Sequence, residues 1–398
     1  MDSTKTQLLN ILGQFIKGEN PTLPANADLD SLFELAGIHS LSAVVCYALN
    51  PQIIANGFDN KAAAKKLQKA LFSTVMLQNE RIFAFEKLLD ILNDKGIRTT
   101  LMKGAVIKNY YPDDTIRTFG DIDFLISPND RDALHNIMVD LGYDYQKAEP
   151  TVWVYVKGNE KYEVHTAVSV KSEALGKKGA DFIDLAFSEV ISTKRQNVFI
   201  LNPSYHFAFL LLHLAKHMRS SGAGVRMYLD LALMLKNEPS LDFEKVIGYS
   251  KDLNLYNFLI HAMNLCHYWF ETTLPKGIKL LKEENMYLLQ EYVLQGGTFG
   301  FYERNPAAQR LRDEKKKGRL AAILRYVFPL YGDIKNAYKF LTDRPYLLPL
   351  AWPCRWFDGI FLRRKKASTV FKGFFTEGDA AKATEQMLTD IGIENNIK

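Results

Sequence analysis

Cysteine is scarce in this sequence, and long apolar runs are missing. The three cysteines are odd in number and far apart, at Cys46, Cys266 and Cys354. They provide neither the CxxC spacing of a metal site nor a disulfide framework, which favours a reducing compartment. The segment nearest in character to a membrane-spanning helix, 346–362, is interrupted by two prolines and two charged residues. The N-terminal residues lack the features of a signal peptide and have the pattern of an amphipathic helix. We therefore expect a cytoplasmic protein without a membrane span.

Linkers rich in proline, glycine or serine, low-complexity tracts and internal repeats are also missing. Of the 398 residues, 47% are hydrophobic and 24% are charged, values that are ordinary for a globular protein. A chain of this length can bury a large core and form about two or three domains. Disorder is therefore not expected away from the chain ends.

Positive charge is unevenly distributed, although the net charge is only +5. The segment 303–366 holds 16 Lys or Arg residues against 6 Asp or Glu, a balance of +10 that leaves −5 for the rest of the chain. Aromatic residues are interleaved in it: Tyr326, Phe328, Tyr331, Tyr338, Phe340, Trp352, Trp356 and Phe357. Such a segment suits a polyanion partner such as RNA. The simpler interpretation, which we favour, is a set of helices with solvated basic faces and a buried aromatic stripe.

The residues before about position 95 have a helical pattern. Asp30–Ala36 looks like a helix start, with Ser31 and Glu34 at capping-box spacing and Asp28 or Asp30 as an alternative cap. Asn60–Leu92 has apolar residues at three- and four-residue spacing and is followed by a helix-stopping glycine.

A mixed pattern of short strands and helices follows. We predict a helix at 130–141 and strands at 97–101, 118–126, 152–156 and 162–170. From Pro203 the pattern is helical again, most clearly at 205–218, 225–235 and 243–269. The fold class is therefore α+β, with a small mixed sheet flanked by helices. The predicted domains are an N-terminal helical region at 1–75, an α/β core at 76–200 and a C-terminal helical domain at 201–398 that contains the basic segment 303–366.

Two pairs of polar residues, an Asp-Asp pair and a Glu-His pair, are the candidates for catalysis. Asp121 and Asp123 are two apart in a strand, so their side chains face the same side, roughly 6–7 Å apart at the backbone. Two carboxylates on one face need a cation between them, and magnesium prefers oxygen ligands and bridges phosphates. Glu163 and His165 share a face in the later strand, and if that strand lies beside the first, Glu163 supplies a third carboxylate. The DxD pattern alone is weak, because it also occurs at helix caps and in sugar-nucleotide-dependent glycosyltransferases.

Cationic and glycine residues surround this acidic set in the sequence. Lys103 and Gly104 follow the first strand, where a glycine lets backbone N–H groups approach a phosphate and a lysine neutralises its charge. Arg117 can reach the same ligand. A solvated lysine, a strand-exit turn and a surface ion pair are the ordinary alternatives for these residues.

Further candidates lie on the later helices. Three histidines recur near one helix face, at His206, His213 and His217. A zinc site there is disfavoured because no HExxH motif or nearby cysteine completes it. We expect this face to abut the site instead, with Lys216 and His217 in reach of a phosphate or the acceptor. Arg226 and Asp230 form either an intrahelical ion pair or contacts to nucleotide phosphate and to base or ribose; both interpretations stay open.

The order of these motifs resembles a known family. The run LMKGAVIKNYYPDDTIRTFGDIDFLI at 101–126 is similar to the signature of an uncharacterised bacterial nucleotidyltransferase family with Lys-Gly, Tyr-Pro, Arg and Gly-Asp-x-Asp in this order. YEVH at 162–165 resembles that family's Glu-Leu-His strand, and a weaker likeness continues through 213–235. The sequence looks more distantly like nucleotidyltransferase toxins of the abortive-infection type.

The resemblance implies a DNA-polymerase-β-like nucleotidyltransferase fold, a nucleoside triphosphate donor and catalysis with Mg²⁺ or Mn²⁺. Asp121, Asp123 and Glu163 would take the metal-binding and catalytic positions, with His165 beside them. The nucleotide would contact a larger set: Lys103, Gly104, Arg117, Gly120, His217, Arg226 and Asp230. The chain departs from classical members of the superfamily, because Lys103-Gly104 stands where they have Gly-Ser. Triphosphate contacts of the Gly-Ser type therefore do not transfer directly.

We predict a nucleotidyltransferase that moves a nucleoside monophosphate from a triphosphate to an acceptor, with RNA one candidate acceptor. One alternative is a DxD glycosyltransferase, which requires a long doubly wound domain before the motif. A second is a nucleotide-binding or regulatory module of the same fold without activity.

Overall fold

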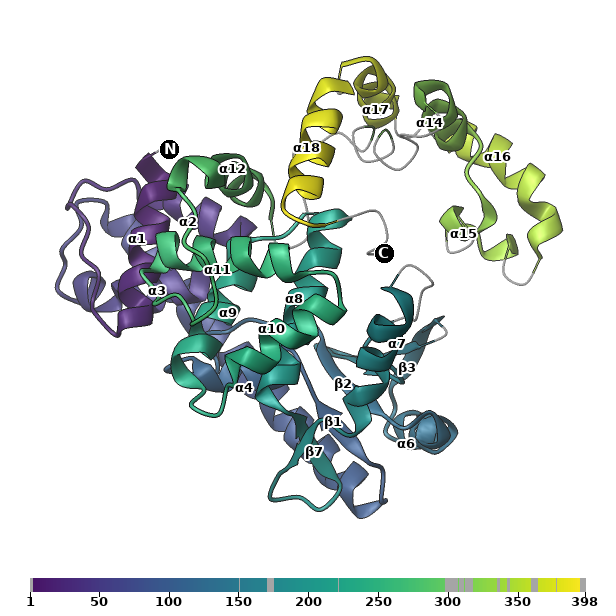
Figure 1. Ribbon diagram of the computed structural model, residues 1–398, viewed down its shortest axis with the longest axis horizontal. Coiled ribbons are helices and arrows are strands. Elements are labelled where there is room, and N and C mark those ends of the chain that lie inside the picture. Colours follow the sequence, from purple (N-terminus) through teal and green to yellow (C-terminus); the bar gives the residue numbers. More distant parts are fainter. Residues whose placement is uncertain are drawn as a thin grey trace. The chain divides into compact units, whose positions relative to one another are not determined.

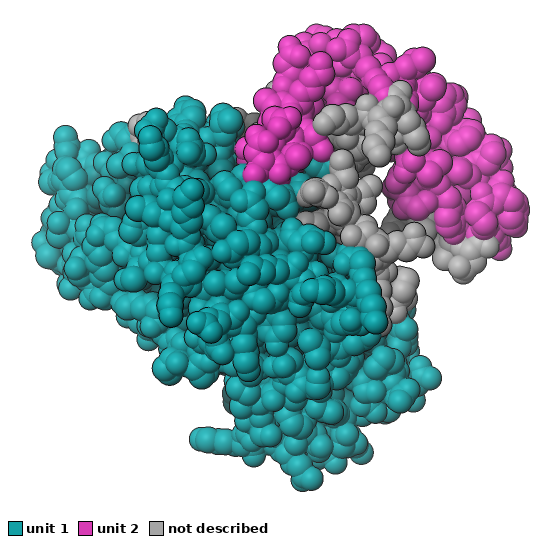
Figure 2. Space-filling model, in the orientation of Figure 1, with its two compact units in different colours: residues 1–300, 391–398 teal, residues 301–390 magenta. Residues whose placement is uncertain are grey.

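The structure is a computed structural model that divides into two compact units (Figure 2). It describes residues 3–149, 151–169, 175–220, 222–297, 307, 311, 318–334, 337–341, 344–358, 364–376 and 378–393. Unit 1 contains residues 1–300 and 391–398, and unit 2 contains residues 301–390. The division into three domains stays a prediction.

A mixed sheet forms the centre of unit 1, and the predicted α+β class is confirmed. Its seven strands have the order β3-β4-β5-β2-β1-β7-β6. Their bounds are β1 Thr99–Leu101, β2 Ile122–Ile126, β3 Asp144–Glu149, β4 Val152–Lys157, β5 Glu160–His165, β6 Val190–Ser192 and β7 Val198–Leu201. Strand β2 pairs antiparallel with β1 and parallel with β5, so it lies near the middle of the sheet. The sheet is larger than expected, because β3, β6 and β7 were not predicted.

Helices make up the rest of unit 1 (Figure 1). They are α1 Ser3–Lys17, α2 Leu29–Ile38, α3 Ser42–Ile54, α4 Lys61–Asp94, α5 Gly104–Ile107, α6 Arg131–Asp140, α7 Gly176–Asp184, α8 Pro203–Arg219, α9 Val225–Asn237, α10 Phe243–Asp252, α11 Tyr256–Phe270 and α12 Tyr287–Gln295. Asp28, one of the two alternative caps, accepts a hydrogen bond from the N–H of Ser31 at the start of α2. The predicted capping box with Ser31 as the cap is wrong, because the helix begins at Leu29 and contains both Asp30 and Ser31. The segment predicted as one helix at 243–269 is two helices, because Asn254 adopts a left-handed φ of 57° between them. No helix of the described residues is long and apolar enough to cross a membrane.

The two faces of the sheet have different roles. Phe124, Tyr162 and Val164 point to one face, where they pack in a core with residues of α4 and α6 such as Phe85 and Leu134. Side chains alternate along a strand, so the residues between them in β2 and β5 point to the other face. Helices α8 and α9 supply the residues that face this second side. The hydrophobic pattern of the strands therefore directs the acidic residues towards α8 and α9.

Unit 2 is helical in its described residues. Its helices are α14 Gly318–Val327, α15 Tyr331–Ile334, α16 Leu348–Phe357, α17 Arg364–Thr376 and α18 Gly378–Asp390. Phe328 packs edge-on against Trp352 and Trp356, whereas Tyr346 and Phe357 are exposed. The expectation of a buried aromatic stripe is wrong, because even the rings that contact one another remain partly or largely exposed. Several stretches of the predicted basic segment 303–366 lie outside the described residues.

Candidate active site

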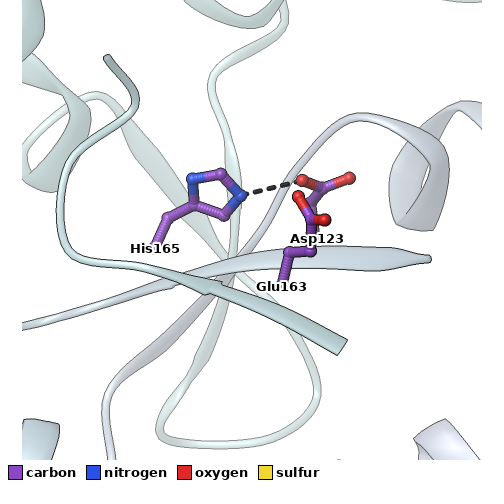
Figure 3. A group of neighbouring side chains, drawn as sticks. All are labelled: Asp123, Glu163 and His165. Carbon is purple, nitrogen blue, oxygen red and sulfur yellow. Dashed lines mark hydrogen bonds and ion pairs between the residues drawn. The ribbon is translucent and has the colours of Figure 1, made fainter. Parts of the chain in front are cut away.

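The acidic residues of β2 and β5 lie side by side. Asp123 is paired with Glu163 in the parallel register of the two strands, and Leu125 is paired with His165. One ligand atom from each of Asp123, Glu163 and His165 lies within 4.8 Å of the others (Figure 3). Asp121 directly precedes β2. It lines a cavity together with Asp123 and Glu163, but it does not belong to the group of three ligand atoms. Strand alternation and register therefore bring the predicted carboxylates together.

Two cationic or polar groups hold Asp123 in its charged form. Its Oδ1 atom lies 2.6 Å from Nζ of Lys103 and 2.8 Å from Nε2 of His165. Burial alone would raise the pKa of Asp123, but the Lys103 ammonium and the His165 ring hold this pKa well below its usual range. Asp123 is therefore a buried carboxylate that stays ionised, as a metal ligand must be.

A lysine that the sequence did not single out bridges the other two carboxylates. Nζ of Lys161 lies 2.9 Å from Oδ2 of Asp121 and 3.0 Å from Oε1 of Glu163. Partial burial lowers the pKa of Lys161, and the hydrogen bonds to Asp121 and Glu163 raise it by more. The signal in the sequence was its place two residues before Glu163, on the same face of β5. All three carboxylates thus have a cation beside them.

The Lys103-Gly104 turn is held in an unusual conformation. Lys103 has a φ of 50°, a left-handed value that is uncommon for a residue with a side chain. Its N–H donates to Nε2 of His206 over 2.8 Å. Burial, and then the charge of Arg117, lower the pKa of His206 to about 3, so the ring is neutral and able to accept. A Cβ atom on Gly104 would lie only 2.6 Å from Nη1 of Arg117, so any side chain here would displace the guanidinium.

Arg117 forms a buried ion pair with α9. Its Nε and Nη2 atoms lie 3.0 and 2.7 Å from the two carboxylate oxygens of Asp230. The Tyr111 hydroxyl donates to the same carboxylate over 2.8 Å. Asp230 thus binds Arg117 in place of the intrahelical partner Arg226 that the spacing offered.

Arg226 is left without a carboxylate partner in the described residues. Its Nη1 donates to the backbone oxygen of Thr118 over 2.8 Å, and its Nε has no hydrogen-bond partner among the described residues. Burial, and then the neighbouring Arg117, lower the pKa of Arg226. A cation in this position favours an anionic ligand.

A cavity of about 300 Å³ joins these groups. Its lining includes most of the residues predicted from the sequence: Lys103, Gly104, Arg117, Gly120, Asp121, Asp123, Glu163, His217, Arg226 and Asp230. His165 and Lys216 line a second, adjoining cavity of about 290 Å³. All predicted site residues therefore gather around these two cavities.

Two histidines of α8, His213 and His217, face the two cavities. Nε2 of His213 lies 3.2 Å from Nε2 of His217, and both residues line both cavities. Burial, and then the charge of Lys103, lower the pKa of each. The possible metal-ligand group found in the described residues is the one on β2 and β5, not this pair. This helix face therefore borders the acidic cavity, next to the carboxylates.

Comparison with known proteins assigns the chain to a family. A family model described as an uncharacterised nucleotidyltransferase matches residues 25–271. The chain belongs to this nucleotidyltransferase family. No curated protein and no solved structure matches. The matched range contains all the residues that line the acidic cavity, so the family's shared region and the candidate active site coincide. The likeness to the DNA-polymerase-β superfamily and to abortive-infection toxins stays a prediction.

Proposed function

We propose that the protein is a metal-dependent nucleotidyltransferase that moves a nucleoside monophosphate from a triphosphate to an acceptor hydroxyl. The observation that carries the proposal is the register of β2 and β5, which sets Asp123 beside Glu163 in a cavity that also holds Asp121, Lys103 and Arg226. Carboxylates and cations in one cavity match the two parts of a metal-bound triphosphate, because the metal needs the first and the phosphates need the second.

The donor atoms fit a hard divalent ion. Asp121, Asp123 and Glu163 offer carboxylate oxygens, which Mg²⁺ and Mn²⁺ prefer, and His165 lies next to them. Lys161 lies between Asp121 and Glu163, and Lys103 lies beside Asp123, so positive charge already stabilises these carboxylates. A divalent ion bound there would neutralise charge on the phosphates and acidify the acceptor hydroxyl.

The cationic residues bind and orient the triphosphate in this proposal. Arg226, which lacks a carboxylate partner in the described part of the chain, binds phosphate oxygens, and Lys103 does so from the turn. Asp230 holds the guanidinium of Arg117 against Gly104, so it acts through Arg117 rather than on base or ribose. The glycine lets the turn and the guanidinium approach closely.

The reaction exchanges one phosphorus–oxygen bond for another. The acceptor oxygen bonds to the α-phosphorus, the bond from that phosphorus to the bridging oxygen breaks, and pyrophosphate leaves. The hydroxyl proton passes to the carboxylate of Asp121 or Glu163 and then to solvent, because the lowered pKa of Asp123 makes that carboxylate a weak base. Catalysis rests on positioning and charge neutralisation, as is usual in phosphoryl chemistry.

The glycosyltransferase alternative lacks support in the fold. It requires a long doubly wound domain before the DxD motif, whereas the residues before β1 form the helices α1 to α4. A binding module without activity has the same geometry as an enzyme, so the labelling experiment below separates the two.

The test is labelling with radioactive triphosphates. The protein is incubated with each of the four nucleotides, Mg²⁺ or Mn²⁺, and either total cellular RNA, protein or small-molecule extract. We expect transfer of label by the wild type and by the control Asp140→Asn, which changes an exposed carboxylate on α6. Label transfer that survives Asp121→Asn together with Asp123→Asn would contradict the proposal. A thermal-shift screen with the same nucleotides identifies the donor, because a ligand of the native state raises its stability.

A further inference from the structure

The second cavity differs in charge from the acidic one. It contains Lys103, His165, Ser169 and Lys216, together with His213 and His217 of α8. No Asp or Glu is among its described lining residues. Basic, imidazole and hydroxyl groups without a carboxylate make a site for an anion, because each can donate a hydrogen bond to it.

Lys216 is the cation that lacks an ionic partner here. Its Nζ bonds to the hydroxyl of Ser169 over 2.7 Å, and no carboxylate in the described residues pairs with it. Burial, and then the charge of Lys103, lower the pKa of Lys216. A partly buried ammonium bound only to a hydroxyl gains more from an anionic ligand than a solvated one does.

The two cavities share part of their lining, next to Asp123. Lys103, His213 and His217 line both of them. Lys103 and His165 both bond to the Oδ1 atom of Asp123, which belongs to the acidic cavity. A molecule in the second cavity therefore lies next to the place where the triphosphate and its metal would bind.

We propose that the second cavity binds the acceptor, and that this acceptor is a small molecule with an anionic group, phosphate or carboxylate, near its reactive hydroxyl. The inference rests on the proposed function, which places the triphosphate in the acidic cavity. The anionic group lies at Lys216 and Ser169, and the hydroxyl points to Asp123, where it attacks the α-phosphorus. The size supports a small molecule, since about 290 Å³ is at the lower end of ligand pockets.

The test is a calorimetric titration of inorganic phosphate, and separately of acetate, into the full chain. The protein is first saturated with Mg²⁺ and a non-hydrolysable triphosphate, so that the cations of the acidic cavity are occupied. We expect the loaded wild type to bind one of the two anions, and the better one indicates whether the acceptor carries phosphate or carboxylate. Lys216→Met should weaken that binding about tenfold or more while nucleotide binding persists.

Two further variants test the hydroxyl partner of Lys216 and the effect of net charge. Ser169→Ala removes the partner of Lys216 without removing charge, and we expect it to weaken anion binding by a smaller factor. Lys279→Gln removes one positive charge from an exposed position of unit 1, and we expect binding like that of the wild type. Thermal unfolding of each variant shows whether it is folded.

The outcomes separate this inference from the proposed function. Nucleotide binding without any anion binding to the loaded protein overturns the acceptor site and leaves the proposed function standing. The acceptor site is also overturned if Lys216→Met weakens nucleotide binding and leaves anion binding unchanged, because the second cavity would then bind the triphosphate. Transfer of label to RNA that is indifferent to Lys216→Met also overturns it. Failure of every nucleotide to bind overturns the proposed function itself.

Discussion

The buried ion pair between Arg117 and Asp230 gives a stability prediction whose size follows from the structure. Both side chains are less than a tenth exposed, at 8% and 9%, and two hydrogen bonds join them. Asp230→Asn keeps the shape of the side chain but leaves the guanidinium uncompensated, close to a second cation, Arg226. Breaking a buried pair in this way costs about 3–5 kcal/mol of unfolding free energy.

A double-mutant cycle measures the coupling between the two side chains. Arg117→Met removes the other partner, and the double variant removes both charges at once. We expect the double variant to lose less than the sum of the two single losses, because neither charge is left unpaired. Tyr111→Phe removes only the hydroxyl that donates to Asp230, and should cost about 1–2 kcal/mol.

The assay is urea unfolding followed by far-ultraviolet circular dichroism, with thermal melts as an independent measure. The expected order of stability is wild type, Tyr111→Phe, then Asp230→Asn. The reasoning is refuted if Asp230→Asn costs about 1 kcal/mol or less, or if the two single losses simply add.

Three further predictions follow from the same site. Gly104→Ala should lower the melting temperature and triphosphate affinity, because its Cβ would clash with a guanidinium, whereas Gly248→Ala on α10 has open space outside the site and serves as the control; equal effects would contradict this. Lys161→Gln should tighten Mn²⁺ binding in calorimetry, since the ion no longer competes with an ammonium between two carboxylates, and weaker binding would contradict this. Burial lowers the pKa of His39 to about 4 and of His206 to about 3, so below about pH 6.5 the unfolded chain takes up protons that the folded chain does not. Unfolding free energy should therefore fall between about pH 6.5 and pH 5, by up to about 1.4 kcal/mol per pH unit for each ring, and pH-independent urea midpoints there would contradict this.

Strand periodicity was the most informative feature of the sequence. The alternation in β2 and β5 predicted that Asp123, Glu163 and His165 would face one side, and the register of the strands places them together. The same alternation turns the intervening residues to the opposite face, and Ile122 and Val164 lie in the core there. These predictions succeed because side chains alternate between the two faces of a strand with a period of two, which can be read directly from the sequence.

Features that depend on distant partners were not predictable. The edge strand β6 has only three residues, too few for a periodic signal, and its place is set by pairing with β7. The partner of Asp230 was unknown because Arg117 lies 113 residues away, whereas Arg226 offered a local alternative. Lys161 was missed because its role depends on a carboxylate of another strand. Local spacing therefore identifies candidate partners, and tertiary packing determines which ion pairs form.

The central claim is that the paired carboxylates of β2 and β5 hold a divalent ion for a bound triphosphate. The most direct test is a calorimetric titration of Mn²⁺ into the wild type and into Asp123→Asn with Glu163→Gln, each with a non-hydrolysable triphosphate. We predict that the wild type binds Mn²⁺ and that the double variant, although folded, binds it about tenfold or more weakly. Equal affinity in the two proteins would contradict the account.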